Sequence, residues 1–269
     1  MIPRILPIAA LAMLATCSRE RPDVARPEAP AKTTPEVSID VVILVSANAE
    51  WRALQKVITP EGMETSPMGA WFPREVVFAD GPRRAIFFHG GWGKIDAAAS
   101  TQYVIDRWRP RYLMNLATCG GLQGRANKGD IFLIEEAITY DIEERMGDSA
   151  EAIAYYTVRL PTPTLSGAAA SSVRKGRIVS ADRDIRPADV ATLIRKYDAD
   201  VADWESSAIA HVAKRNQTPV YIIRGVTDVV SDAGSEAYGN LEGFEAEAQK
   251  ILGRLVELLG DVTLLDELR

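Results

Sequence analysis

The chain has few of the residues that build disulfide frameworks and metal centres. Only two cysteines and two histidines occur among 269 residues, so we expect neither a disulfide scaffold nor a histidine-based zinc site. The apolar run at residues 5–15 is shorter than the ~20 residues that a membrane-spanning helix needs. Basic residues are not in excess either, because 31 Lys and Arg stand against 37 Asp and Glu. The net charge of −6 argues against nucleic acid as a partner, since binding its backbone needs clustered positive charge.

The overall composition is that of an ordinary globular protein. Hydrophobic residues make up 47 % and charged residues 25 % of the chain, which excludes disordered and collagen-like proteins. The length fits one large α/β domain or two small ones.

The first part of the chain is expected to be a targeting segment followed by a linker. Residues 1–16 combine Arg4, an apolar run and small residues, which is the pattern of a secretory signal peptide. The tetrapeptide ending at Cys17 (LATC) resembles a bacterial lipobox, so we expect Cys17 to be lipidated and to become the mature N-terminus. Residues 17–37 are rich in proline and charge and are expected to form a linker. The protein is therefore expected to be exported, periplasmic or membrane-anchored, with the lipid as its only membrane contact.

Residues 38–269 alternate between two hydrophobic periodicities and are expected to form one domain. Strands separated by helices of 10–15 residues predict an α/β fold, with a mostly parallel or mixed central sheet between two helical layers. The expected strands are residues 39–45, 75–79, 84–89, 112–117, 130–139, 152–159, 176–181, 200–203 and 219–226. The expected helices are residues 49–58, 94–107, 164–174, 187–197, 206–215 and 241–259.

Three carboxylates follow predicted strands, where α/β sheets bind their ligands. Glu205 could accept hydrogen bonds from a sugar diol, or it could be an acid in the first turn of a helix. Asp228 ends an apolar strand and could be a general acid with a raised pKa, or it could cap a turn. Glu50 could orient a water molecule, or it could be a solvated helix residue. Together they would supply the acid, the base and the diol acceptor needed to split a glycosidic bond.

Other polar and glycine-rich segments carry no specific signal. The sequence GGWGK at residues 90–94 matches neither the P-loop nor the Rossmann pattern. The acidic run at residues 135–144 is interpreted as solvated surface. We therefore expect neither a metal ion nor a cofactor.

Several segments of the predicted domain, in their order along the chain, resemble the nucleoside phosphorylase/nucleosidase superfamily. The resemblance is greatest to its bacterial 5′-methylthioadenosine/S-adenosylhomocysteine nucleosidases. The resemblance covers residues 39–250 and so implies the three-layer fold of that superfamily. The matching segments, in order, are ILVSANAE, GGWGKIDAA, NLATCGGL with KGDIFL, GRIVSAD, ADWESSAIAHVA and PVYIIRGVTD.

The resemblance implies a role for each residue that falls on a family motif. Asp228 falls on the general acid that protonates the purine at N7, and Glu205 falls on the acceptor of the ribose hydroxyls. Glu50 is the candidate for the carboxylate that positions the attacking water. The remaining substrate-binding positions implied by the resemblance are Thr118, Gly120, Gly121, Ile185, Asp203, Trp204 and Thr227.

The sequence departs from the family pattern at three positions. Counting without a gap puts Trp51 at the position of the water-orienting glutamate, and a one-residue deletion restores Glu50. Asp184, followed by Ile185, stands where the family has an aromatic that stacks on adenine. Loss of that stack would weaken base binding by ~1–3 kcal/mol and leaves adenine specificity open. Asn115 stands where related phosphorylases have a phosphate-binding arginine, which favours water as the nucleophile.

The resulting hypothesis is hydrolysis of the N-glycosidic bond of a purine nucleoside or of a nucleoside carrying a methylthio or homocysteinyl group at C5′. One alternative is a phosphate-dependent phosphorylase. Another is an exported nucleoside-binding or storage protein without turnover, which Trp51, Trp204 and Asp184 at pocket positions leave open. A small-molecule nucleoside is the expected ligand, and the resemblance implies a homodimer.

Overall fold

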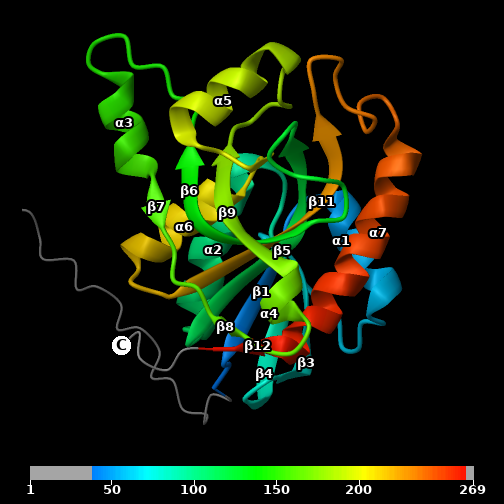
Figure 1. Cartoon of the computed structure of the whole chain (residues 1–269). Helices are drawn as coiled ribbons and strands as arrows, with labels where there is room; N and C mark the ends of the chain where they lie inside the picture. The colour runs from blue at the N-terminus through cyan, green and yellow to red at the C-terminus, as the bar shows by residue number, and fades with distance from the viewer. Residues whose placement is uncertain (1–37, 265–269) are drawn as a thin grey trace, which may run out of the picture. The chain divides into compact units, whose positions relative to one another are not determined.

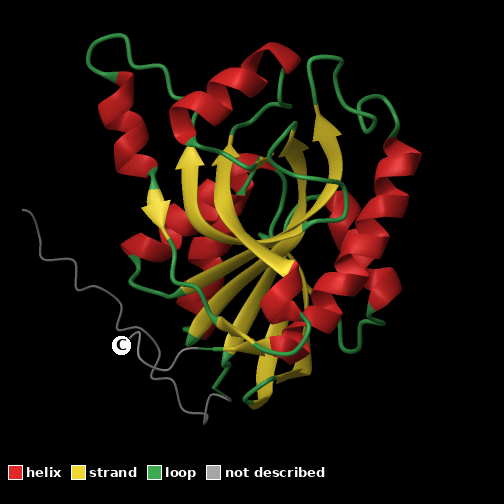
Figure 2. Ribbon diagram, in the orientation of Figure 1, coloured by secondary structure: helices red, strands yellow, loops and turns green. Residues whose placement is uncertain are grey.

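The computed structural model describes residues 38–264, in which helices flank a mixed β-sheet (Figures 1 and 2). β1 pairs in parallel with both β4 and β5, and β11 also runs parallel to β5. In order across the sheet, the strands are β10 (Val201–Asp203), β9 (Val173–Ser180), β6 (Ile131–Thr139), β11 (Val220–Val230), β5 (Tyr112–Leu122), β1 (Val41–Val45), β4 (Gly81–His89), β3 (Gly69–Phe78) and β2 (Glu64–Ser66).

Part of the sheet closes on itself. β10 pairs in parallel with β9 and antiparallel with the end of β5, so β5, β11, β6, β9 and β10 form a closed ring of strands. The short strand β7 (Val158–Arg159) pairs with β6. A second, two-stranded sheet joins β8 (Thr164–Leu165) to β12 (Val262–Thr263).

Helices cover both faces of the sheet, and the alternation of side chains along the strands supplies both interfaces. Val41 and Ile43 of β1 pack in the cluster that contains residues of α1 (Asn48–Val57) and α7 (Leu241–Leu258). Leu44 packs in the opposite cluster, with α2 (Gly93–Trp108) and α6 (Ser206–Arg215). Strands buried on both faces are continuously apolar, which is why β1 reads VVILV. The remaining helical segments are α3 (Ser149–Tyr156), α4 (Ala169–Ser172), α5 (Val190–Tyr197) and the 3₁₀ turns η1 (Pro187–Asp189) and η2 (Leu259–Asp261).

The predicted α/β class with helices on both sides of a mixed sheet is confirmed, but two segments were predicted wrongly. Residues 152–159 are not one strand, because α3 begins after Asp148, whose side chain accepts a hydrogen bond from the Ala150 amide. Residues 164–174 are not one helix, because Gly167 adopts a φ of +56° and interrupts the segment. The backbone on either side of this glycine is extended, in β8 and from Val173 in β9.

Two central strands run farther than their apolar sequences predicted. β5 continues through the glycine pair to Leu122, and β11 continues through Thr227 and Asp228 to Val230. The register between them shifts at a β-bulge, since Val226 pairs with Cys119 while Asp228 pairs with Gly120. Thr227 is thus the extra residue of a bulge, a device that redirects the side chains after it.

The expected membrane and targeting features fall mostly outside the described part of the chain. Among residues 38–264, no helix combines the length and the apolar character needed to cross a membrane. The expected signal peptide (1–16), the linker (17–37) and the lipidation site Cys17 lie outside the described residues.

Candidate active site

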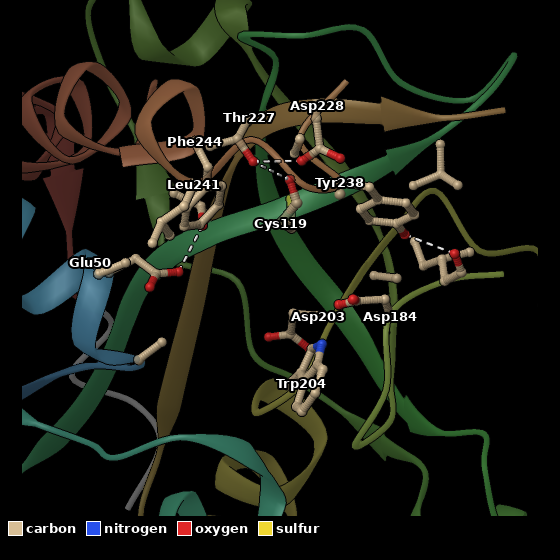
Figure 3. Close-up of a pocket in the computed structure, with 18 of the residues that line it drawn as sticks. Glu50, Cys119, Asp184, Asp203, Trp204, Thr227, Asp228, Tyr238, Leu241 and Phe244 are labelled. Carbon is tan, nitrogen blue, oxygen red and sulfur yellow. Dashed lines mark hydrogen bonds between the residues drawn. The ribbon is translucent and has the colours of Figure 1, made fainter. Parts of the chain in front are cut away.

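A cavity of about 710 Å³ opens where β1, β5, β10 and β11 end (Figure 3). Most of the residues singled out from the sequence line it, although they come from segments as far apart in the chain as residues 50 and 228. Predicted positions on its wall are Glu50, Thr118, Gly120, Asp184, Ile185, Asp203, Trp204, Glu205, Thr227 and Asp228.

Glu50 lies in the first turn of α1 and points into the cavity from one side (Figure 3). The Thr118 hydroxyl donates a hydrogen bond of 2.7 Å to Glu50 Oε1. The other carboxylate oxygen of Glu50, Oε2, is buried and has no hydrogen-bond partner among the described residues. Burial raises the pKa of Glu50, and the Thr118 hydrogen bond opposes that rise. Glu50 thus lines the cavity with one carboxylate oxygen whose hydrogen-bonding capacity is unused by the described residues.

Trp51, which the sequence also placed at a pocket position, is a core residue. Its ring stacks on His89 at a centroid distance of 5.5 Å and packs against Phe72 at 5.7 Å. It is 6 % exposed and is not part of the cavity wall. Of the two neighbours, Glu50 is therefore the one that faces the cavity.

Glu205 lies at the N-terminal boundary of α6 on a different wall of the cavity. The backbone amide of Gly93, at the start of α2, donates to Glu205 Oε1 at 2.9 Å. Burial raises the pKa of Glu205, and the nearby carboxylates of Asp203 and Glu50 raise it further. A buried carboxyl group with a raised pKa can bind a sugar hydroxyl as either donor or acceptor.

Arg224 lies fully buried in the middle of β11, beside these acids, and the sequence analysis missed it. Its Nη2 forms an ion pair of 2.8 Å with Asp203 Oδ2 and donates to Asn115 Oδ1 at 2.5 Å. Its Nη1 is buried without a hydrogen-bond partner in the described part of the chain. The signal that could have revealed it is a single charged residue inside the apolar strand sequence VYIIRGV.

Asp203 lines the cavity, but its carboxylate is already engaged by the protein. Besides Arg224, it accepts hydrogen bonds from the hydroxyls of Ser180 and Ser206, each at 2.6 Å. The Ser206 amide adds a further bond of 3.0 Å. Asp203 thus holds Arg224 and the start of α6, and little of its hydrogen-bonding capacity remains for a ligand.

Asp228 faces the cavity from the bulged end of β11, opposite Glu50 in Figure 3. Thr227 Oγ1 lies 2.8 Å from Asp228 Oδ1, and Ser235 Oγ donates to Oδ2. Burial raises the pKa of Asp228, while these two hydrogen bonds oppose the rise. A carboxyl group with a raised pKa in a largely apolar site is suited to general acid catalysis.

The wall next to Asp228 contains an aromatic residue that the sequence analysis did not identify. Tyr238, between β11 and α7, donates through its hydroxyl to the Ile185 carbonyl at 2.7 Å (Figure 3). Asp184, which replaces the expected stacking aromatic, lines the same wall. Tyr238 lies in a polar segment without hydrophobic periodicity, so nothing in the sequence marked it.

The three remaining positions differ in their relation to the cavity. Gly120 lies on its floor, and a Cβ there would come within 3.9 Å of Asp228 Oδ2. Gly121 does not line it, and a Cβ there would come within 3.0 Å of Ala126 and Val226. The Trp204 ring lies 5.6 Å from that of Trp92, and both rings line the cavity.

Metal ligands do not gather here. In the stretch from residue 38 to residue 264, no cluster of three or more His, Cys, Asp or Glu side chains has the arrangement of a metal site.

The sequence of the chain matches that of known proteins over most of its length. The sequence model of the Phosphorylase superfamily matches residues 49–259. The 5′-methylthioadenosine/S-adenosylhomocysteine nucleosidase of Bacillus subtilis is 25 % identical over 175 residues, covering 61 % of this chain and 74 % of that protein. The nucleosidase of the same name from Treponema pallidum is 29 % identical over 209 residues, covering 65 % and 75 %.

The fold is also similar to that of solved structures. The 5′-methylthioadenosine nucleosidase of Arabidopsis thaliana superimposes with a TM-score of 0.64 at 22 % sequence identity. The match covers 82 % of this chain and 95 % of the plant enzyme.

Proposed function

We propose that this chain, which belongs to the phosphorylase superfamily, hydrolyses the N-glycosidic bond of a 5′-modified purine nucleoside and releases the free base. The curated relatives are named for 5′-methylthioadenosine and S-adenosylhomocysteine, and we take these as the first candidate substrates. The support within the cavity is the presence of one acid, one base and one diol acceptor on separate walls.

Asp228 is the acid of the proposed reaction. Its raised pKa keeps a proton on the carboxyl group above the usual range for aspartate, and the group can donate that proton to a purine ring nitrogen. Protonation withdraws electrons from the glycosidic bond, so the base leaves as a neutral molecule while positive charge develops on the ribose.

Glu205 and Glu50 act on the ribose and on the water. Glu205 binds the ribose hydroxyls, and an ionised Glu50 removes a proton from the water that attacks C1′. The observation that carries the proposal is the buried Oε2 of Glu50, which has no partner in the described residues while Thr118 holds Oε1. A carboxylate held by one oxygen and free at the other is a preoriented base.

Release of the base, followed with and without phosphate, tests this proposal. We expect adenine to appear from 5′-methylthioadenosine at the same rate in both conditions, with free 5-methylthioribose as the second product. Formation of a sugar 1-phosphate would establish a phosphorylase instead. Tight nucleoside binding without base release would establish a binding protein.

Asp228→Asn is the companion variant, because an amide keeps the shape of the side chain but supplies no acidic proton. We expect kcat to fall about 10²–10⁴-fold. Activity close to that of the wild type would overturn the assignment of Asp228.

The chain is also proposed to be exported and anchored by a lipid on Cys17. The support is the sequence alone: Arg4, the apolar run and the LATC tetrapeptide. Metabolic labelling with an alkyne fatty acid should mark the wild-type protein and not the Cys17→Ser variant. Unlabelled wild-type protein in the cytoplasm would refute both the export and the lipidation of Cys17.

A homodimer is proposed from the apolar side chains at the start of α2. Trp92 is 61 % exposed and Ile95 is 81 % exposed, and Trp92 also lines the cavity. Exposed apolar patches often mark interfaces between chains. Light scattering should give twice the chain mass for the wild type and the monomer mass for Ile95→Glu, and a monomeric wild type would refute the dimer.

A further inference from the structure

The segment between β11 and α7, residues 231–240, crosses one end of the cavity and is tied to it by two side chains. We refer to this segment as the strap. The Ser235 hydroxyl donates to Asp228 Oδ2, and the Tyr238 hydroxyl donates to the Ile185 carbonyl. Both contacts are made at the end of the cavity that holds Asp228, which the proposed function assigns to the purine and which we call the base end. The strap and the acid are therefore joined by a hydrogen bond.

The two oxygens of Asp228 have donors of different kinds. Ser235 Oγ already accepts a hydrogen bond from the Ala237 amide at 3.1 Å. Its own hydrogen is donated to Asp228 Oδ2, the acceptor beside it. A donor fixed in this way favours an unprotonated oxygen at Oδ2.

The donor at Oδ1 has a second acceptor. Thr227 Oγ1 lies 2.8 Å from Asp228 Oδ1 and 3.3 Å from the carbonyl oxygen of Cys119. A hydroxyl has one hydrogen, which can serve either oxygen. When Oδ1 is protonated, the Thr227 hydrogen can turn to Cys119 and leave Oδ1 free to donate.

From this asymmetry we propose that Ser235 is a positioning residue, which keeps Asp228 Oδ2 as an acceptor and so holds the acidic proton on Oδ1. The inference rests on the proposed function, since it assigns the proton of the proposed acid to one of its two oxygens. Tyr238 supports it indirectly by holding the strap against Ile185.

The ionisable groups around Asp228 do not provide this asymmetry. Glu236 of the strap raises the pKa of Asp228, and Lys128, in the connection between β5 and β6, lowers it. Cys119 of β5 and Tyr238 of the strap interact electrostatically with Asp228 and are uncharged at neutral pH. The hydroxyls of Ser235 and Thr227 are the groups that touch its individual oxygens.

The test is the Ser235→Ala variant of the full chain. Without the Ser235 hydrogen bond the pKa of Asp228 should rise, because that bond favours the ionised form. The falling limb of the kcat profile, which requires a protonated Asp228, should move to higher pH. We expect kcat to fall about tenfold with little change in KM, since the proton is no longer restricted to Oδ1.

Three further variants separate positioning from a general effect on the strap. Ser235→Thr keeps the hydroxyl and should restore the wild-type pH profile. Tyr238→Phe loosens the strap and should shift the profile in the same direction as Ser235→Ala, by less. Ser231→Ala removes a hydroxyl that bonds only within the strap, to Gly234 and Ala233, and should leave the profile unchanged.

Titration of Asp228 by ¹³C NMR gives a readout that does not depend on turnover. A rise in its pKa in Ser235→Ala, but not in Ser231→Ala, is the expected result. An unchanged pKa in folded Ser235→Ala would overturn the inference even if the wild type releases base. If the wild type releases no base, the proposed function fails, while the NMR titration still tests the role of Ser235.

Discussion

The two ends of the cavity hold their acidic groups by different means. At the end that the proposed function assigns to the ribose, called the ribose end, Glu50 and Glu205 lie at the starts of helices and are bonded to β5 and to the start of α2. At the base end, one oxygen of Asp228 is bonded within β11 and the other by Ser235 of the strap. The chemistry of the ribose end is thus set by regular elements, whereas that of the base end also depends on an irregular segment.

This difference indicates which part of the site can change its substrate preference while the fold stays the same. Loops tolerate substitution and insertion better than the elements that they join. We therefore expect substitutions in the strap to change the pH dependence and the preference for the base. Substitutions at the ribose end should instead remove activity or stability altogether.

The largest effect is expected from Glu50→Gln. Glutamine can still accept the Thr118 hydrogen bond but cannot take a proton from water, so kcat should fall about 10²–10⁴-fold with little change in KM. Measurement of initial rates of base release checks this. Trp51→Phe is the neighbouring control, and it should keep kcat within about twofold because Trp51 packs in the core. Equal losses in both variants would point to a folding defect instead.

Removal of the buried guanidinium group of Arg224 should have the next largest effect, which is a loss of stability. Arg224→Met leaves Asp203 buried without its ion-pair partner, and we expect the free energy of unfolding to fall by about 3 kcal/mol or more. Urea denaturation measures the change. The double variant with Asp203→Asn should lose less than the sum of the single variants, since both remove one interaction. Strictly additive losses would show that the two side chains do not interact.

A smaller effect is expected when Glu205 is replaced, and it concerns how the free energy of unfolding depends on pH. Burial raises the pKa of Glu205 from 4.5 to about 8, so its contribution to stability is fully present below about pH 4.5 and is lost as the pH rises through 8. Glu205→Gln, which cannot ionise, should narrow the difference in unfolding free energy between pH 6 and pH 9 by about 2–3 kcal/mol. Chemical denaturation at the two pH values checks this, and an equal difference in both proteins would contradict it.

The sequence alone predicted the regular parts of the fold and the acids attached to them. β1, β5 and β11 were visible because strands buried on both faces are continuously apolar. Since ligands bind beyond the ends of such strands, Glu50, Glu205 and Asp228 could be selected before any geometry was known. The choice of Glu50 over Trp51 needed the structure, because one residue of register in α1 decides which side chain faces the cavity.

The parts that could not be predicted depend on contacts between distant segments. Residues 164–174 contain helix-forming alanines, yet Gly167 and the pairing of Val173 with Ile131 of β6 make the chain extended at both ends. Tyr238 reaches the cavity, and Ser235 reaches Asp228, only because the strap folds back over β11. Neither the local helix and strand propensities nor the hydrophobic periodicity can predict that a segment folds back over a strand in this way.

The bulge at Thr227 reverses the faces of β11. Before it, the even-numbered residues Ile222 and Val226 pack on the side of α2 and α6, whereas after it Val229 packs on that side. The extra residue therefore sends Asp228 to the face opposite that of Val226, where it meets the cavity. If Thr227 instead paired with Gly120 and the strand alternated strictly, Asp228 would fall on the same face as Val226 and turn away from the cavity, with every residue of the site still in the sequence.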